Sequence, residues 1–153
     1  MENPPHVALR PNRLPLAVHV LVVSALSLSF VSGVMMWKAQ ANGQPSRSWA
    51  VFHGALNPLL AALFGYLLCD HIRLGWQNKV NRGTGLLMEL VFATLLVSGT
   101  GVYYAPEGWQ RAVILVHRGA GCLVPLSLAA HWIAGIRHGR QLQKELAPET
   151  QSQ

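Results

Sequence analysis

The chain has 153 residues, of which 51% are hydrophobic and only 12% are charged, and its formal net charge is +6. A soluble domain has about a quarter of its residues charged, and a disordered chain is poor in apolar residues, so both classes are excluded. The basic residues form no stripe that would follow a nucleic acid. Cys69 and Cys122 form neither a Cys-x-x-Cys motif nor a disulfide framework. The sequence therefore predicts an integral membrane protein.

Four apolar stretches are long enough to cross a bilayer, whose core of about 30 Å needs roughly 20 helical residues. They cover about residues 14–37, 49–72, 85–104 and 112–136. The connections between them are short and polar, which makes neighbouring helices antiparallel. We expect an all-α membrane protein, a bundle of four transmembrane helices. Its membrane domain covers residues 14–137, between a cytoplasmic N-terminal segment (1–13) and a cytoplasmic C-terminal tail (138–153).

The first stretch also resembles a signal peptide, because Arg10 and Arg13 precede an apolar run and an Ala-Gln-Ala triplet follows it. The run is longer than the usual 7–15 residues of such a signal, which favours a retained span. The distribution of Lys and Arg predicts the orientation, because eight lie on the side of the termini and four on the opposite side. The positive-inside rule then places both termini in the cytoplasm.

The second hairpin repeats features of the first at a nearly constant offset. Ser32-Gly33 and Ser98-Gly99 are 66 positions apart, and His53 and His117 are 64 apart. The change in offset falls in an outer loop, where insertions are tolerated. The bundle is therefore expected to contain two antiparallel helical hairpins, related by a pseudo-two-fold axis along the membrane normal.

Histidines inside the spans are the candidate functional residues, because ionisable side chains in a bilayer are costly. His117 and His131 are 14 residues apart, which places them on nearly the same face of one helix, about 21 Å apart along its axis. His53 occupies the place of His117 in the first repeat. Two imidazoles facing each other across a bundle can ligate one haem iron, so we expect His53 and His117 to form the outer pair.

The inner pair needs a partner for His131, and two histidines are candidates. Counting residues from the outer surface gives His19 the same depth as His131, whereas His71 lies one helical turn too deep. His19 is therefore preferred, and His71, beside Asp70, is expected to meet a haem propionate, a quinone head group or water. Basic residues near the two ends of the bundle are candidate propionate partners; they are Lys38, Arg47, Arg111 and Arg118 outside and Arg13, Arg73 and Arg137 inside.

The stretches His117-Arg118-Gly119 and Ala130-His131-Trp132, with His19 and His53, resemble the prokaryotic di-haem b-type cytochromes. These include the gamma subunit of respiratory formate dehydrogenase and the cytochrome b subunit of nickel–iron hydrogenase. The resemblance covers roughly residues 15–140 and implies two haems b in a bacterial cytoplasmic membrane. It implies that His53 and His117 ligate the outer haem and that His19 and His131 ligate the inner one.

The expected function is that of a haem-b membrane anchor and electron-transfer subunit of a respiratory oxidoreductase. Its partners would be membrane lipid, an outer iron–sulfur or cytochrome c subunit, and quinone. Glu89 is a candidate proton carrier for quinone, with His71, Asp70 and Asn78 nearby. A stand-alone redox enzyme, such as a quinone-coupled superoxide oxidase, is an alternative, and so is a haem-free transporter or assembly factor.

Overall fold

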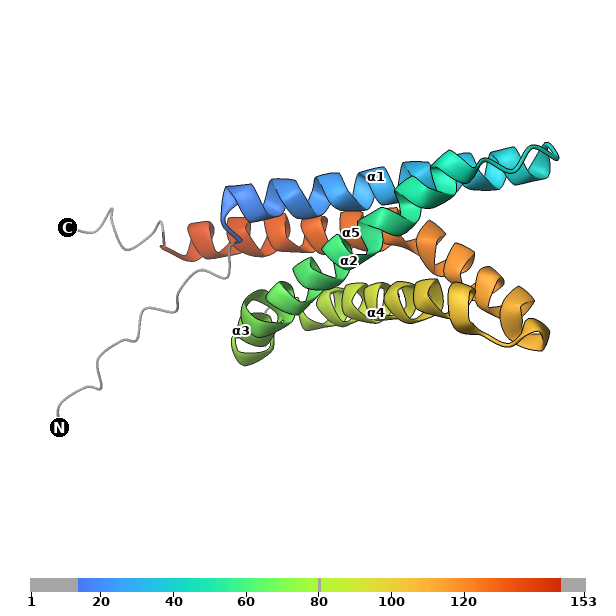
Figure 1. Ribbon diagram of the computed structural model, residues 1–153. Helices are drawn as coiled ribbons and strands as arrows, with labels where there is room; N and C mark the ends of the chain where they lie inside the picture. The colour runs from blue at the N-terminus through green and yellow to red at the C-terminus, as the bar shows by residue number, and fades with distance from the viewer. Residues whose placement is uncertain (1–13, 80, 147–153) are drawn as a thin grey trace, which may run out of the picture.

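The computed structural model describes residues 14–79 and 81–146, so the predicted N-terminal segment and residues 147–153 lie outside the described part. The described residues form helices joined by short turns (Figure 1). Four helical segments are long and apolar enough to cross a membrane, as the sequence predicts. They are Leu16–Ala41, Arg47–Gln77, Arg82–Tyr104 and Glu107–Gln141.

Helix α1 (Leu16–Ala41) is a single uninterrupted helix, whereas the second span changes its helical type near its end. The span begins as α2 (Arg47–Leu67), where the Ser46 hydroxyl accepts a hydrogen bond from the Trp49 amide. It continues as a π-helical turn, η1 (Leu68–Ile72), and ends as α3 (Arg73–Gln77). A π turn holds more residues than an α turn, because each amide bonds five residues back instead of four.

The second half of the chain forms α4 (Arg82–Tyr104) and α5 (Glu107–Leu146). Helix α5 is bent (Figure 1), and it contains Pro125, which has no amide hydrogen and clashes with the preceding turn. Helix α5 also continues past the end of the expected span at residue 136. The first part of the predicted C-terminal tail is therefore helical.

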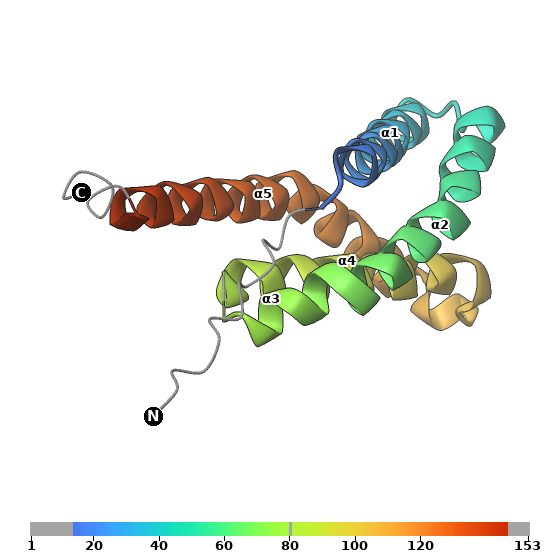
Figure 2. The same cartoon turned by 90° about the vertical axis from the view of Figure 1, so that its left-hand side faces the viewer.

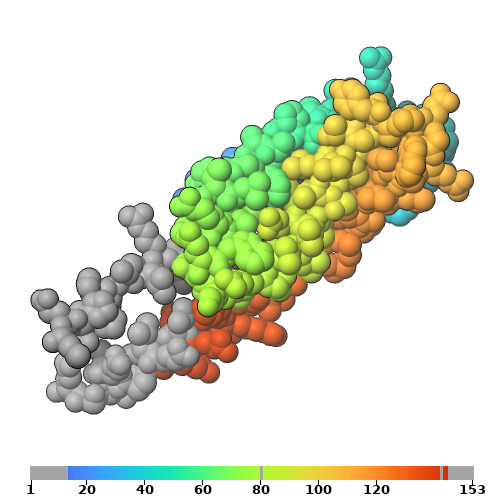
Figure 3. Space-filling view, turned by 90° about the horizontal axis from the view of Figure 1, so that it is seen from below, coloured from blue at the N-terminus to red at the C-terminus, as the bar shows by residue number. Residues whose placement is uncertain are grey.

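The closest helix packing is between α4 and α5 and between α1 and α2. In Figures 1 and 2, α2 lies beside α1 near its N-terminal end and approaches α4 near its C-terminal end. Seen from below, α2, α4 and α5 form one continuous surface (Figure 3). All four long helices supply the small apolar core, which consists of Val22, Ala25, Leu26, Leu60, Leu63, Val91, Phe92 and Val124.

Many large apolar side chains within the spans remain exposed. Val97 is 75% exposed, Leu126 67% and Leu115 61%. Such exposure is costly in water but not against lipid tails, because these are as apolar as the side chains themselves. The arrangement therefore matches a membrane bundle whose outer surface faces lipid.

Candidate functional site

The structure brings His53 of α2 and His117 of α5 together. Their ring centroids are 6.0 Å apart and their planes make an angle of 86°. Both side chains are half-buried. The two rings come from different halves of the chain, from the two positions that correspond in the internal repeat.

A buried serine of α1 holds the His53 ring. The Ser32 hydroxyl lies 2.9 Å from His53 Nδ1 and donates its own proton to the Ser29 carbonyl, also at 2.9 Å. His53 Nδ1 is also 3.0 Å from the same carbonyl oxygen. The next residue, Gly33, lies against the ring, since a Cβ there would meet His53 Cε1 at 3.2 Å.

The same arrangement holds His117 in the second repeat. The Ser98 hydroxyl lies 3.0 Å from His117 Nδ1 and donates to the Thr94 carbonyl at 2.5 Å. A Cβ on Gly99 would meet His117 Cε1 at 3.2 Å, the same distance as in the first repeat. Ser32 and Ser98 are almost fully buried, which their contacts with the histidines explain.

These contacts favour one position for the ring proton. A carbonyl oxygen only accepts hydrogen bonds, and each serine hydroxyl is placed to give its proton to a carbonyl of its own helix. This arrangement favours donation from the histidine Nδ1 to the serine oxygen. That leaves Nε2 with its lone pair, which is the state in which a neutral imidazole binds a metal ion.

The inner pair differs from the expectation. His131 of α5 faces His71 of η1, with ring centroids 6.2 Å apart and planes at 84°. His19 is exposed on α1 and does not form the expected ring pair with His131. It lies close enough to His71 to interact with it electrostatically, as does Asp70. The ring next to His131 is thus that of His71 and not that of His19, and the role of His19 as a haem ligand stays a prediction.

The expected depth of His71 assumes an ideal α-helix, and the second span is not one. His71 lies within the π turn Leu68–Ile72, where the same number of residues gives less advance along the axis and a different rotation. The second span also contains Pro58, which disturbs the helical hydrogen bonds above His71. A residue count that assumes a straight α-helix therefore places His71 too deep.

His131 has the same kind of contact as the two outer histidines. The Thr84 hydroxyl lies 3.3 Å from His131 Nδ1 and donates to the Asn81 carbonyl at 3.2 Å. Gly85 follows, and a Cβ there would lie 3.8 Å from His131 Cε1. A Ser/Thr-Gly pair therefore contacts three of the four paired histidines, each time from the preceding long helix.

Ser32-Gly33 and Ser98-Gly99 mark the repeat in the sequence, but the predicted site included neither serine and did not include Thr84. A signal was present in the spacing. Thr84 and Ser98 are 14 residues apart on α4, as are His117 and His131 on α5. Equal spacings on two packed helices indicate that each hydroxyl meets one histidine.

Comparison of the chain with protein-family models, curated proteins and solved structures gives no match. The interpretation of the site therefore depends on its own geometry. The described residues contain no group of three or more His, Cys, Asp or Glu side chains that could hold a metal ion. Each histidine pair can thus supply two protein ligands to a metal, and these two would be the two imidazoles.

Arg118, one of the predicted outer propionate partners, follows His117 and contacts α1. Its guanidinium donates to Gln40 Oε1 at 2.5 Å and lies 5.6 Å from the centre of the Trp37 ring. Arg118 therefore connects α5 to α1, next to His117.

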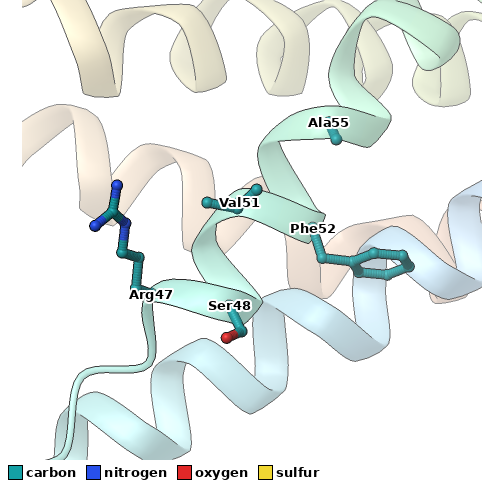
Figure 4. Close-up of a pocket in the computed structure, with 5 residues that line it drawn as sticks. All are labelled: Arg47, Ser48, Val51, Phe52 and Ala55. Carbon is teal, nitrogen blue, oxygen red and sulfur yellow. The ribbon is translucent and has the colours of Figure 1, made fainter.

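Two surface grooves lie on the described residues, and neither is lined by the predicted quinone residues. Figure 4 shows the first, a groove of about 540 Å³ on α2 lined by residues that include Arg47, Val51 and Phe52. The second lies between the beginning of α4 and the C-terminal part of α5 and includes Thr84. Glu89 and Asn78 are half-buried and Asp70 is exposed, and none of the three lines either groove.

Proposed function

We propose that the chain is a di-haem b membrane protein that transfers electrons across the membrane. His53 and His117 would hold the outer haem, and His71 and His131 would hold the inner one. The observation that carries this proposal is the pair of ring separations, 6.0 Å and 6.2 Å. Two imidazoles bound axially to one metal, with bonds of about 2 Å, have ring centroids about 6 Å apart.

The number of ligands also favours haem over a bare metal ion. A protein site for a single ion usually supplies three or four ligands, and no such group exists among the described residues. A haem needs only two protein ligands, because the macrocycle supplies the other four. When bound in this way, it provides one-electron chemistry with both axial positions filled, which favours electron transfer over oxygen binding.

The residues around the imidazole rings orient them for metal binding. Ser32, Ser98 and Thr84 accept the Nδ1 protons of His53, His117 and His131, so that each Nε2 is available to a metal. The adjoining glycines, Gly33 and Gly99, let α1 and α4 approach these rings closely. The chain would thus orient the ligands before the haems bind and so reduce the entropy lost on binding.

The contacts also support the predicted pair of antiparallel hairpins. On α4 and α5, Thr84 meets His131 and Ser98 meets His117, so residue numbers rise along one helix as they fall along the other. Ser32 and His53 repeat the Ser98 and His117 contact in the first half. A pseudo-two-fold axis along the membrane normal would relate the two outer contacts.

The resemblance to the membrane subunits of respiratory complexes suggests the partners. An iron–sulfur or cytochrome c protein would exchange electrons at the outer pair, and quinone would react near the inner pair on the cytoplasmic side. Half-buried Glu89 is the candidate proton carrier in α4, and Asp70 and Asn78 flank the inner end of the second span. The excess of Lys and Arg on that side supports a cytoplasmic location for both termini.

The direct test is the haem content of the full chain, expressed in bacterial membranes and purified in mild detergent. A pyridine haemochrome assay should give about two haems b per chain, and reduction should give the spectrum of six-coordinate haem. A colourless protein, or one haem per chain with both pairs intact, would contradict the proposal. Measuring quinone reduction with the isolated chain and with its co-purifying proteins then separates a stand-alone enzyme from a subunit.

A further inference from the structure

The groove between α4 and α5 includes Thr84 and the candidate propionate partner Arg137, but the proposed electron transfer does not account for the rest of its lining. The groove has a volume of about 550 Å³ and lies between the beginning of α4 and the C-terminal part of α5. One part is lined by polar side chains, namely Asn81, Arg137, His138 and Gln141. The other part is lined by the small and apolar side chains of Ala130, Ile133 and Ala134.

The two parts of the groove lie one after the other along the expected membrane normal. Ala130, Ile133 and Ala134 belong to the apolar region of α5, whereas Arg137, His138 and Gln141 come one to two turns later, at the end of the span. A ligand in the groove would thus meet apolar side chains at membrane depth and polar ones at the water interface. A phospholipid has the same order of chemistry, with acyl chains in the core and a phosphate at the surface.

The charge of the groove selects an anionic head group. Arg137 supplies a permanent positive charge, and neither Asp nor Glu is among the described side chains that line the groove. Arg140 and Lys144 follow on the same helix and add to the positive potential. Basic pockets between transmembrane helices on the cytoplasmic side characteristically bind anionic lipid head groups.

We propose that this groove binds one anionic phospholipid, with its phosphate at Arg137 and His138 and an acyl chain along Ala130, Ile133 and Ala134. Asn81 and Gln141 offer amide donors to the remaining phosphate oxygens. The lipid would lie across the α4–α5 contact next to Thr84, the residue that holds His131. This proposal depends on the membrane location but not on the presence of haem.

The test uses the purified full chain in detergent and native mass spectrometry with added phosphatidylglycerol or phosphatidylcholine. The wild-type chain should retain one phosphatidylglycerol in preference to phosphatidylcholine. Arg137→Gln should weaken phosphatidylglycerol binding by about fivefold, the effect of losing one basic contact with an anionic lipid. Arg140→Gln is the matched control, since it removes the same charge three residues away and outside the groove, and it should change binding by less than about twofold.

A second variant tests the apolar part without changing the charge. Ala134→Phe fills the groove and should weaken phosphatidylglycerol binding while leaving the helical circular dichroism unchanged. Equal losses in the Arg137 and Arg140 variants would show non-specific attraction and overturn the proposal. It would also fail if inorganic phosphate competed as strongly as phosphatidylglycerol, or if Arg137→Gln lowered haem content instead of lipid binding.

Discussion

The outer and inner histidine pairs have nearly the same ring geometry but are built differently. In the outer pair each histidine contacts a Ser-Gly pair of the preceding helix, and the two contacts are copies of each other. In the inner pair His131 contacts Thr84-Gly85, whereas His71 lies in a π turn that the second half of the chain does not repeat. A duplicated sequence thus explains the outer pair, and a local irregularity of one helix is needed for the inner pair.

Among the variants that test this difference, alanine substitutions of the paired histidines should lower the haem content most. His53→Ala or His117→Ala should remove the outer haem, and His71→Ala or His131→Ala should remove the inner one, each lowering haem content by about half. The pyridine haemochrome assay measures the loss, and redox titration shows which of the two potentials remains.

His19→Ala is the control for the inner pair, because His19 is exposed and does not face His131. It should leave both haems bound. Loss of the inner haem in His19→Ala, with retention in His71→Ala, would show that His19 is the ligand when haem is present.

The π turn provides a sharper test of the difference between the pairs. Deleting Cys69, an exposed residue within Leu68–Ile72, would remove the extra residue that the π turn holds, so His71 would keep nearly its present orientation in a regular α-helix. Deleting the exposed Ala62 in α2 would instead rotate His71 by about 100° relative to His53. The inner haem should be retained after the first deletion and lost after the second, while the outer haem stays bound in both, as measured by redox titration. Cys69→Ala keeps the chain length and should retain both haems, so its loss of the inner haem would implicate the thiol instead of the turn.

The sequence predicted the parts of this molecule that depend on regular periodicity. Four apolar stretches predicted the four candidate spans. The offset between the repeats predicted that the rings of His53 and His117 lie close together. It did not predict His71 opposite His131, since residues 68–72 carry no local sequence signal for a π turn and a count along a straight helix assumes that none exists. Ligand identity, partners and the direction of electron flow depend on groups outside the chain and stay predictions.

The glycines next to the rings should affect the two pairs unequally. A Cβ on Gly33 or Gly99 would meet a histidine Cε1 at 3.2 Å, whereas one on Gly85 would lie 3.8 Å away, in ordinary contact. Gly33→Ala and Gly99→Ala should therefore displace the outer ligands and weaken outer haem binding by about tenfold, as expected for an overpacking cost of 1–3 kcal/mol.

Gly85→Ala is a matched control, because all three substitutions gain the same helix propensity of about 1 kcal/mol. Haem retention during dilution or heating, followed at the Soret band, measures the effect. Equal losses in all three variants would indicate that helix stiffening, and not ring contact, is responsible.

Removal of the hydroxyl groups that contact the histidines should have the smallest effect. It should shift the midpoint potentials of the haems. Ser98→Ala removes the oxygen that accepts the Nδ1 proton of His117, which makes the imidazole a weaker electron donor and should raise the midpoint potential of the outer haem. Loss of the hydrogen bond should also cost about 1 kcal/mol of stability. Thr84→Ala should shift the inner potential less, because the oxygen there is 3.3 Å from His131 Nδ1 instead of 3.0 Å. Ser98→Thr should restore the outer potential, since Thr84 shows that a threonine serves at the equivalent place; a potential unchanged in Ser98→Ala would mean that this hydroxyl only fills space.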